Sequence, residues 1–262
     1  SNITVTLGSN PNYSVQATNS TLTIGTRTAS VTADAKSKTY GDVNPALTAT
    51  EAGTVNGDLL SYTLATDAAQ FSSVGFSNIT VTLGSNPNYS VQATNSTLTI
   101  GTKASSVTAN NAGKNYGQTL TFTGTEFTSS GFVGGDTVTS VMLTSSGTTN
   151  TASVGTYSIV ASAATGTGLG NYTLSYTNGT LTVNPATPVT ANSPVRLPDG
   201  NFQLIFTGGD PGVSYVIQAS DDLSNPVWSN LSTNTATLSG IPSFIDLSAT
   251  NNPVRFYRTV IP

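Results

Sequence analysis

The chain has 262 residues, a formal net charge of −4 and a charged fraction of only 8%. It contains only eight Lys and Arg residues, so it lacks the basic surface that binds nucleic acids and anionic membranes. It has no His, the usual general base, and no Cys, so it can form neither thiolate metal sites nor disulfides. Thr accounts for 47 residues, and because Thr and Val favour strands while Gly and Asn favour turns, the composition predicts an all-β protein. The sequence contains no run of about 18 apolar residues, so no membrane-spanning helix is predicted.

A 26-residue segment occurs twice without any change, at residues 1–26 and 77–102. The correspondence continues more loosely from residues 27–41 to 103–117, and a diverged copy of the segment's second half lies at 171–183. Such periodicity indicates tandem modules rather than one catalytic domain. We therefore expect four parts: an incomplete repeat (1–26), two complete repeats (27–102 and 103–185) and a different C-terminal module (186–262).

Within the repeated segment, apolar residues alternate with Asn and Thr at 79–83, resume at 89–93 and return at 98–100, as in half-buried strands. The front halves predict further strands at 30–35, 46–52 and 59–64, and at 106–111, 120–125 and 137–143. Short strands separated by turns predict antiparallel, immunoglobulin-like β-sandwiches, and the short passage from 100 to 105 predicts an extended rod. The expected core residues are Val81, Leu83, Tyr89, Val91, Leu98 and Ile100 in the first complete repeat, and Tyr172, Leu174, Leu181 and Val183 in the second.

Several short motifs recur in both repeats. The first contains Lys38-Thr39-Tyr40-Gly41-Asp42, Asn44-Pro45, Asn56-Gly57-Asp58, Val74-Gly75, Asn88-Tyr89 and 95–100; the second contains Tyr116-Gly117, Gly135-Asp136, 154–157, Asn171-Tyr172 and 178–183, and lacks the Asn-Pro. This combination resembles the MBG family of bacterial immunoglobulin-like repeats over residues 1–184. The resemblance implies non-catalytic tandem modules of exported bacterial proteins, outside the cell or on its surface, with no catalytic residues and no cofactor.

The C-terminal part has a different character, with four Pro residues between 185 and 198 and the one Trp of the chain. Apolar residues alternate at 202–206 and at 215–219, and 256–260 predicts a last strand. The order of Gly200, Phe202, Tyr215, Trp228 and 256–258 resembles the small fibronectin-III-like modules of exported bacterial proteins. That resemblance implies a second type of sandwich and a natural chain end at Pro262.

Few acidic residues are candidates for chemistry. Glu51 and Glu126 could act as paired glycosidase carboxylates, but they occupy comparable places in successive repeats, which favours a scaffold role. Asp58 and Asp136 are typical turn residues. Asp210, Asp221 and Asp222 offer oxygen ligands for Ca²⁺, although an Asp-Asp pair in a loop is more often solvated, and calcium binding at 221–222 stays open. We expect no catalytic residue and no metal site.

Three lysines, Lys36, Lys38 and Lys114, have two interpretations. A buried Lys beside an Asn and an acid can form an intramolecular cross-link, whereas an exposed Lys on an edge strand prevents unwanted strand pairing. The second interpretation is favoured.

Aromatic residues of the C-terminal module also have two interpretations. Trp228 with Tyr215 or Tyr257 could form a stacking platform for a glycan, but a single Trp in a sandwich more often occupies the centre of the core. The glycan platform is therefore the weaker hypothesis.

Residues 1–26 match the back half of a repeat whose front half does not precede them in this sequence. Without partner strands, their apolar residues would be exposed at open sheet edges. The segment could fray as a truncated end, fold back on its own chain or pair with another chain. Our hypothesis is inter-chain strand pairing, against the C-terminal sandwich of a neighbour, which would produce a filament. The residues concerned are Ile3, Val5, Leu7, Tyr13, Val15, Leu22 and Ile24.

The favoured function is a non-catalytic extracellular stalk or fibre, whose partner is a second copy or other surface-protein repeats. The alternatives are an adhesive or carbohydrate-binding region and an accessory region of a larger secreted enzyme.

Overall fold

The computed structural model describes residues 1–252 and 254–262. Its regular structure in these residues consists of strands and three short 3-10 helices, which confirms the all-β class. None of these helices has the length and apolar character needed to cross a membrane. The chain divides into two compact units, Ser1–Lys103 with Gly170–Thr173, and Ala104–Leu169 with Leu174–Pro262.

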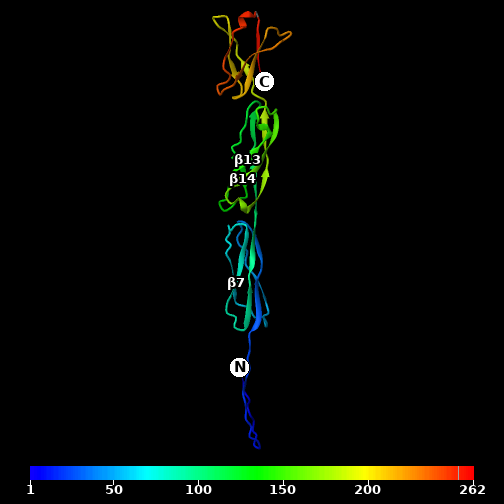
Figure 1. Cartoon of the computed structure of the whole chain (residues 1–262), viewed down its shortest axis with the longest axis vertical. Helices are drawn as coiled ribbons and strands as arrows, with labels where there is room; N and C mark the ends of the chain where they lie inside the picture. Colours follow the sequence, from blue (N-terminus) through cyan, green and yellow to red (C-terminus); the bar gives the residue numbers. More distant parts are fainter. Residues whose placement is uncertain (253) are drawn as a thin grey trace. The chain divides into compact units, whose positions relative to one another are not determined.

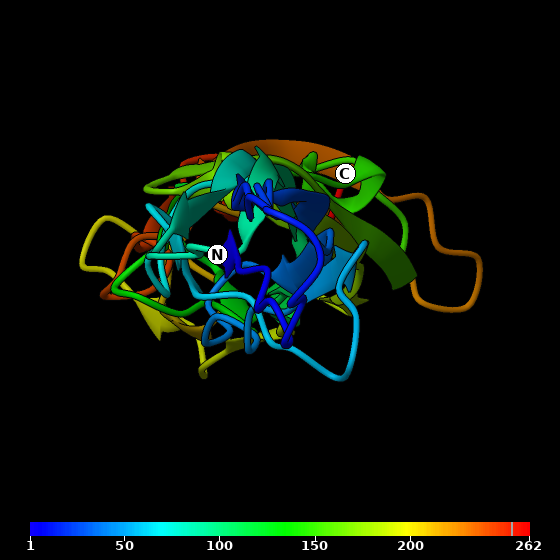
Figure 2. The same ribbon diagram turned by 90° about the horizontal axis from the view of Figure 1, so that it is seen from below.

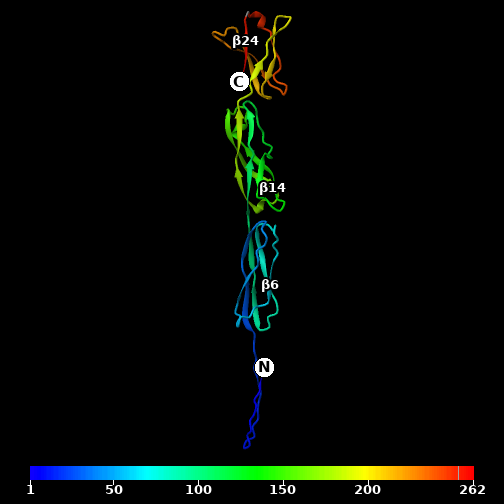
Figure 3. The same ribbon diagram turned by 180° about the vertical axis from the view of Figure 1, so that it is seen from behind.

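The first complete repeat is a sandwich of two sheets, built around β7 (Figure 1). One sheet has the order β5-β3-β8 and consists of Ala49–Ala52, Arg27–Ala33 and Tyr89–Thr94. The other has the order β4-β9-β7-β6 and consists of Lys36–Thr39, Ser96–Gly101, Gly75–Leu83 and Tyr62–Thr66, with β6 at one edge (Figure 3). Alternate residues of β3 are buried, and they pack with Leu60, Tyr62 and Val81.

Two strand pairs in this repeat are parallel, whereas the prediction was of antiparallel sheets. β3 pairs in parallel with β8, from Arg27 opposite Tyr89 to Thr32 opposite Thr94. β4 pairs in parallel with β9, and Thr39 lies opposite Gly101. Residues 27–39, which form β3 and β4, therefore run parallel to residues 89–101, which form β8 and β9. Each of these two stretches contributes its first strand to one sheet and its second strand to the other. Parallel pairing suits strands that are far apart in sequence, because it needs a long connection.

The second complete repeat has the same topology. Its sheets have the orders β12-β10-β15 and β11-β16-β14-β13, and β11 pairs in parallel with β16. The strands are β10 (Lys103–Ala109), β11 (Ala112–Asn115), β12 (Phe127–Ser130), β13 (Val138–Thr144), β14 (Gly155–Gly166), β15 (Tyr172–Thr177) and β16 (Gly179–Asn184), with β13 and β14 labelled in Figure 1. Two 3-10 helices, Ser146–Thr148 and Leu169–Asn171, lie in its loops.

Most of the predicted core residues lie inside the repeats. Leu98, Ile100, Leu181 and Val183 are buried. Tyr172, predicted in the core of the second repeat, is also buried, but its ring contacts Tyr40 of the first repeat and it belongs to the first compact unit. Val81, Tyr89, Val91 and Leu174 are partly buried. Leu83 is 36% exposed, so its predicted core position is wrong: it is the last residue of β7, at the rim of the sheet.

The C-terminal module has three small sheets, β17-β20, β18-β19-β23 and β22-β21-β24. Its strands are β17 (Val189–Ala191), β18 (Val195–Arg196), β19 (Phe202–Leu204), β20 (Phe206–Gly208), β21 (Ser214–Ser220), β22 (Ser229–Thr235), β23 (Phe244–Asp246) and β24 (Phe256–Val260), with a 3-10 helix at Ala249–Asn251. Figure 3 labels β24, and Figure 2 shows the exposed loop 221–227, in orange, projecting from the module. Tyr215 is 1% exposed and lies in the core, whereas Trp228 is only partly buried, so the expected central core position of Trp228 is wrong.

Candidate functional site: an uncovered half repeat and two Tyr-Gly turns

Residues 1–26 and 77–102 have the same sequence but opposite exposure. Ile79, Leu98 and Ile100 are 0%, 0% and 2% exposed in the complete repeat. Their counterparts Ile3, Leu22 and Ile24 are 50%, 52% and 78% exposed. The rest of the predicted pairing residues, Val5, Leu7, Tyr13 and Val15, are exposed as well. The segment, dark blue in Figures 1 and 2, therefore presents as surface the side chains that form the core of its twin.

The local structure of the twin nevertheless persists in residues 1–26. Strand β1 (Asn2–Ile3) pairs with β2 (Ser20–Thr21), and Ile3 faces Ser20 as Ile79 faces Ser96. The segment thus folds back on itself in the register of a complete repeat.

Three side-chain and turn contacts are also preserved. The Val5 N–H donates to Asn19 Oδ1 at 3.2 Å, as that of Val81 donates to Asn95 Oδ1 at 2.9 Å. The Asn10 side chain donates to the Gly8 carbonyl, as Asn86 does to Gly84. The Tyr13 N–H donates to Asn10 O, as the Tyr89 N–H does to Asn86 O. These local bonds form without the front half, because each joins groups inside the segment.

A Tyr-Gly turn follows β4 in the first repeat, and Lys38 organises it. The Lys38 ammonium donates to the carbonyls of Asp42 at 3.1 Å, Ala69 at 2.7 Å and Gln70 at 3.1 Å. Gln70 Nε2 in turn donates to the Gly41 carbonyl at 2.8 Å. Gly41 has φ 84°, a left-handed conformation that Gly adopts at little cost. Lys38 therefore ties two loops together, which is a different role from the predicted guarding of an edge.

The ring of Tyr40 joins this turn to residues 170–173, which belong to the same compact unit. Tyr40 is 4% exposed and makes edge-on contacts with Phe71 at 6.2 Å and with Tyr172 at 5.4 Å between ring centroids. Parallel pairing of β4 with β9 places the turn here, because it brings the Tyr40 N–H to the Gly101 carbonyl. The Val74 N–H donates to Asn171 Oδ1 at 3.0 Å, and the hydroxyls of Thr102 and Thr173 are 2.7 Å apart.

The second Tyr-Gly turn, in the second unit, contacts the turn at 210–213. Lys114 is 6% exposed and donates to the carbonyls of Gln118 and Thr149 at 2.8 and 2.7 Å, and burial lowers the pKa of its ammonium. Because it is buried, the predicted role as an exposed edge residue is wrong for Lys114. Asn115 Nδ2 donates to Asp210 Oδ1 at 2.7 Å.

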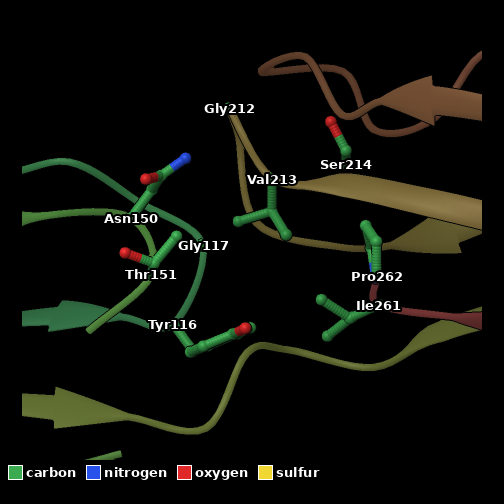
Figure 4. A pocket seen from close by; sticks show the side chains of 9 residues that line it. All are labelled: Tyr116, Gly117, Asn150, Thr151, Gly212, Val213, Ser214, Ile261 and Pro262. Atoms are coloured by element: carbon green, nitrogen blue, oxygen red, sulfur yellow. The ribbon is translucent and has the colours of Figure 1, made fainter. Parts of the chain in front are cut away.

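Gly117, with φ 85°, lies so close to Val213 that a Cβ on it would be 2.9 Å from Val213 Cγ1. A cleft of about 210 Å³ lies beside this contact, lined on one side by residues that include Tyr116, Asn150 and Thr151 and on the other by Val213, Ile261 and Pro262 (Figure 4). The Tyr-Gly motif of the first unit thus contacts an aromatic ring through Tyr40, whereas that of the second unit contacts the Val213 side chain through Gly117.

A model of the family described as MBG domain (YGX type) matches residues 29–99 and 106–182, which together are more than half of the chain. The chain belongs to this family. MBG repeats are a non-catalytic type of domain and occur in bacterial surface proteins. No curated protein sequence matches the chain. The matched ranges do not include residues 186–262, so the fibronectin-III-like resemblance of that module stays a prediction.

Each of the two glutamates of the MBG repeats accepts hydrogen bonds from residues of its own repeat. Glu51 Oε2 accepts from the Leu60 N–H at 3.1 Å. Glu126 accepts from the Thr123 N–H and hydroxyl and from the N–H groups of Gly124 and Thr125. The N–H and hydroxyl of Thr123 are the main reason that the pKa of Glu126 falls to about 2. Such bonds suit a structural cap rather than a general acid, which must hold a proton near neutral pH.

Glu126 gives the second MBG repeat a measurable pH dependence. Its pKa is about 2 in the folded chain against an ordinary value of 4.5, so the carboxylate stabilises the fold above pH 4.5, and this contribution is lost as pH falls through 2. We expect Glu126→Gln to lower the free energy of unfolding by about 1 kcal/mol at pH 7, since water screens this partly exposed group. Urea unfolding of both proteins at several pH values should show their difference shrinking below pH 4.5. A difference that stays constant down to pH 2 would contradict this assignment.

The candidate calcium ligands are not brought together. Asp210 accepts from Asn115 and Thr187, whereas Asp222 caps Ser224 and Asp221 lies 3.8 Å from Arg255. Among the described residues, no group of three or more His, Cys, Asp or Glu could hold a metal ion.

The three aromatic residues do not share one surface either. The Tyr215 hydroxyl donates to the Thr187 carbonyl at 2.9 Å, and Tyr257 packs on the same core and donates to Asp246 at 3.0 Å, where burial raises the pKa of Tyr257 to about 12. The Trp228 ring instead lies 4.2 Å from the Arg258 guanidinium, and Arg258 alternates with Tyr257 along β24. The sheet therefore separates Trp228 from the two tyrosines.

Sequence reasoning found the Tyr-Gly motif but assigned no role to it. Its position two residues after a Lys in both repeats was visible in the sequence. The contacts of that Lys depend on loops 31 to 35 residues further along, at 69–70 and at 149, which no local pattern identifies.

Proposed function

We propose that the chain is a non-catalytic structural part of an extracellular bacterial surface protein, a stalk or fibre subunit of MBG repeats, in which residues 1–26 pair with strands of another chain. The observation that carries the proposal is the exposure of Ile3, Leu22 and Ile24, whose twins are fully buried. Membership of the MBG family supports the surface location.

Burial of this segment would release considerable free energy. Covering a side chain such as Ile or Leu is worth about 1.5–3 kcal/mol, and strand addition also pairs backbone groups that an open edge leaves to water. With three such residues about half exposed or more, the segment has a strong tendency to associate. Such association would join chains of a stalk or fibre end to end.

The absence of suitable catalytic groups in the sequence supports the structural role. The chain has no His or Cys, and its two glutamates accept hydrogen bonds within their own repeats. Neither a Ser-His-Asp nor a Cys-His triad can therefore form.

Removal of residues 1–26 tests the proposal. We expect the full chain to form assemblies in light scattering, and both the deleted chain and the Ile24→Asp variant to be monomeric, because a charge on the apolar face opposes its burial. The matched control is Leu238→Asp, which alters an apolar residue that is 96% exposed elsewhere and should assemble like the full chain. A monomeric full chain, or assembly that survives the deletion, would refute the role of 1–26.

A further inference from the structure

We propose that the Tyr-Gly turn of the second MBG repeat is a docking surface that holds the C-terminal module in a fixed orientation. The two sides of this joint are residues 114–118 and the turn at 210–213, and both belong to the second compact unit. The partner that fits the surface is a turn with a carboxylate and a compact aliphatic side chain. The inference goes beyond the proposed function and does not depend on residues 1–26.

The carboxylate of Asp210 connects three parts of the second unit. It accepts from Asn115 Nδ2 of the repeat at 2.7 Å, and from both the N–H and the hydroxyl of Thr187, which lies between β16 and β17. The Asp210 N–H donates to the Tyr215 hydroxyl in the core of the C-terminal module. Asp210 is 8% exposed, and a buried carboxylate is costly unless hydrogen bonds compensate for the lost water. Loss of the Asn115 donor should therefore weaken the joint.

The bond between Asn115 and Asp210 depends on charge. Burial raises the pKa of Asp210, but the hydrogen bonds from Thr187 and Asn115 outweigh burial and lower the pKa below its ordinary value. The carboxylate is therefore ionised at neutral pH, and a hydrogen bond to an ionised acceptor is stronger than one between neutral groups. A second carboxylate at position 115 would instead face Asp210 with a like charge.

A close contact between the backbone of the repeat and an aliphatic side chain forms the rest of the joint (Figure 4). Gly117 has φ 85°, and a Cβ on it would be 2.9 Å from Val213 Cγ1. Val213 is 1% exposed and packs in the core of the C-terminal module. The Gln118 side chain donates to the Pro211 carbonyl at 3.3 Å. The two turns therefore fit together only because position 117 has no side chain.

Bonds within the repeat hold the docking surface in shape. The Lys114 ammonium donates to the carbonyls of Gln118 and Thr149, and the Gly117 N–H donates to the Asn150 carbonyl at 3.0 Å. None of these three bonds involves the C-terminal module, so they do not depend on docking. A surface that is already ordered loses less conformational entropy when its partner binds, which favours a fixed orientation.

The test measures distances between the second repeat and the C-terminal module in the full chain. The chain has no Cys, so Ser129→Cys and Ser229→Cys, at exposed positions of the two modules, provide two spin labels. We expect double electron–electron resonance to give one narrow distance distribution. Asn115→Asp in the labelled chain should broaden this distribution at least about twofold, because two carboxylates would then face each other in a buried site.

The reciprocal exchange and a charge control complete the first comparison. Asn115→Asp combined with Asp210→Asn again places one amide opposite one carboxylate, so the narrow distribution should return. The control is Asn111→Asp, which adds the same charge to the same repeat. The Asn111 side chain accepts from the Thr180 N–H, a bond that a carboxylate can also accept, so this variant should keep the narrow distribution.

A pair of glycine substitutions tests the close contact separately. Gly117 and Gly135 have φ 85° and 87°, so Ala introduces a similar backbone strain at either position. A Cβ on Gly135 would have nothing within 4 Å, whereas one on Gly117 would collide with Val213. We expect Gly117→Ala to broaden the distance distribution and Gly135→Ala to leave it narrow.

Three results would overturn the inference: a broad distribution for the labelled chain without further substitution, equal widths for Asn115→Asp and Asn111→Asp, or equal widths for Gly117→Ala and Gly135→Ala. Failure of the reciprocal exchange to restore the narrow distribution would overturn the pairing of Asn115 with Asp210. Since none of these variants alters residues 1–26, each result is distinct from the outcome of the assembly experiment.

Discussion

Replacing Tyr40 with Ala is expected to lower the free energy of unfolding of the first compact unit by about 3–4 kcal/mol. Tyr40 is 4% exposed, and its ring contacts Phe71 and Tyr172 edge-on. The substitution removes both ring contacts and leaves a cavity where the ring was buried. The loss is large because the ring is almost fully buried and both of its aromatic contacts are removed.

Urea unfolding followed by circular dichroism measures this effect. The control is Phe76→Ala, which removes an aromatic ring that is 80% exposed in the same repeat and should cost less than about 0.5 kcal/mol. A Tyr40→Ala chain as stable as the Phe76→Ala chain would mean that the Tyr-Gly turn contributes little to the unit.

The all-β class and most of the core followed from local pattern. Alternation at 96–101 correctly placed Leu98 and Ile100 inside the sandwich, because side chains of a strand point to opposite faces in turn. The same alternation occurs in parallel and antiparallel strands, so it could not reveal that β3 and β4 run parallel to β8 and β9. Leu83 kept the alternation but lies at the end of its strand, where the second sheet no longer covers it.

Contacts between distant loops were beyond sequence reasoning. The pattern placed Lys114 on a strand of the second repeat, but only the fold brings the Thr149 carbonyl to its ammonium. Trp228 was expected in the core because a single Trp in a sandwich usually lies at its centre. Tyr215 lies there instead, and its hydroxyl donates to the Thr187 carbonyl as a buried partner.

The identical segments mark the clearest limit of local reasoning. Residues 1–26 and 77–102 share every side chain and several hydrogen bonds, and their burial differs because only the second segment is covered by residues 27–66. Neither segment determines its own burial. The front half determines it, and this dependence is the physical basis of the proposed association.

A matched pair of substitutions, Leu98→Ala and Leu22→Ala, measures this dependence most directly. The two leucines have the same neighbours in sequence but are 0% and 52% exposed. Leu98→Ala should lower the free energy of unfolding by about 3 kcal/mol, as for a fully buried leucine, and Leu22→Ala by less than about 0.5 kcal/mol. The measurement is urea unfolding by circular dichroism, at protein concentrations where light scattering shows a monomer. Equal losses for the two substitutions would mean that Leu22 is already covered within the chain, and residues 1–26 would then need no partner.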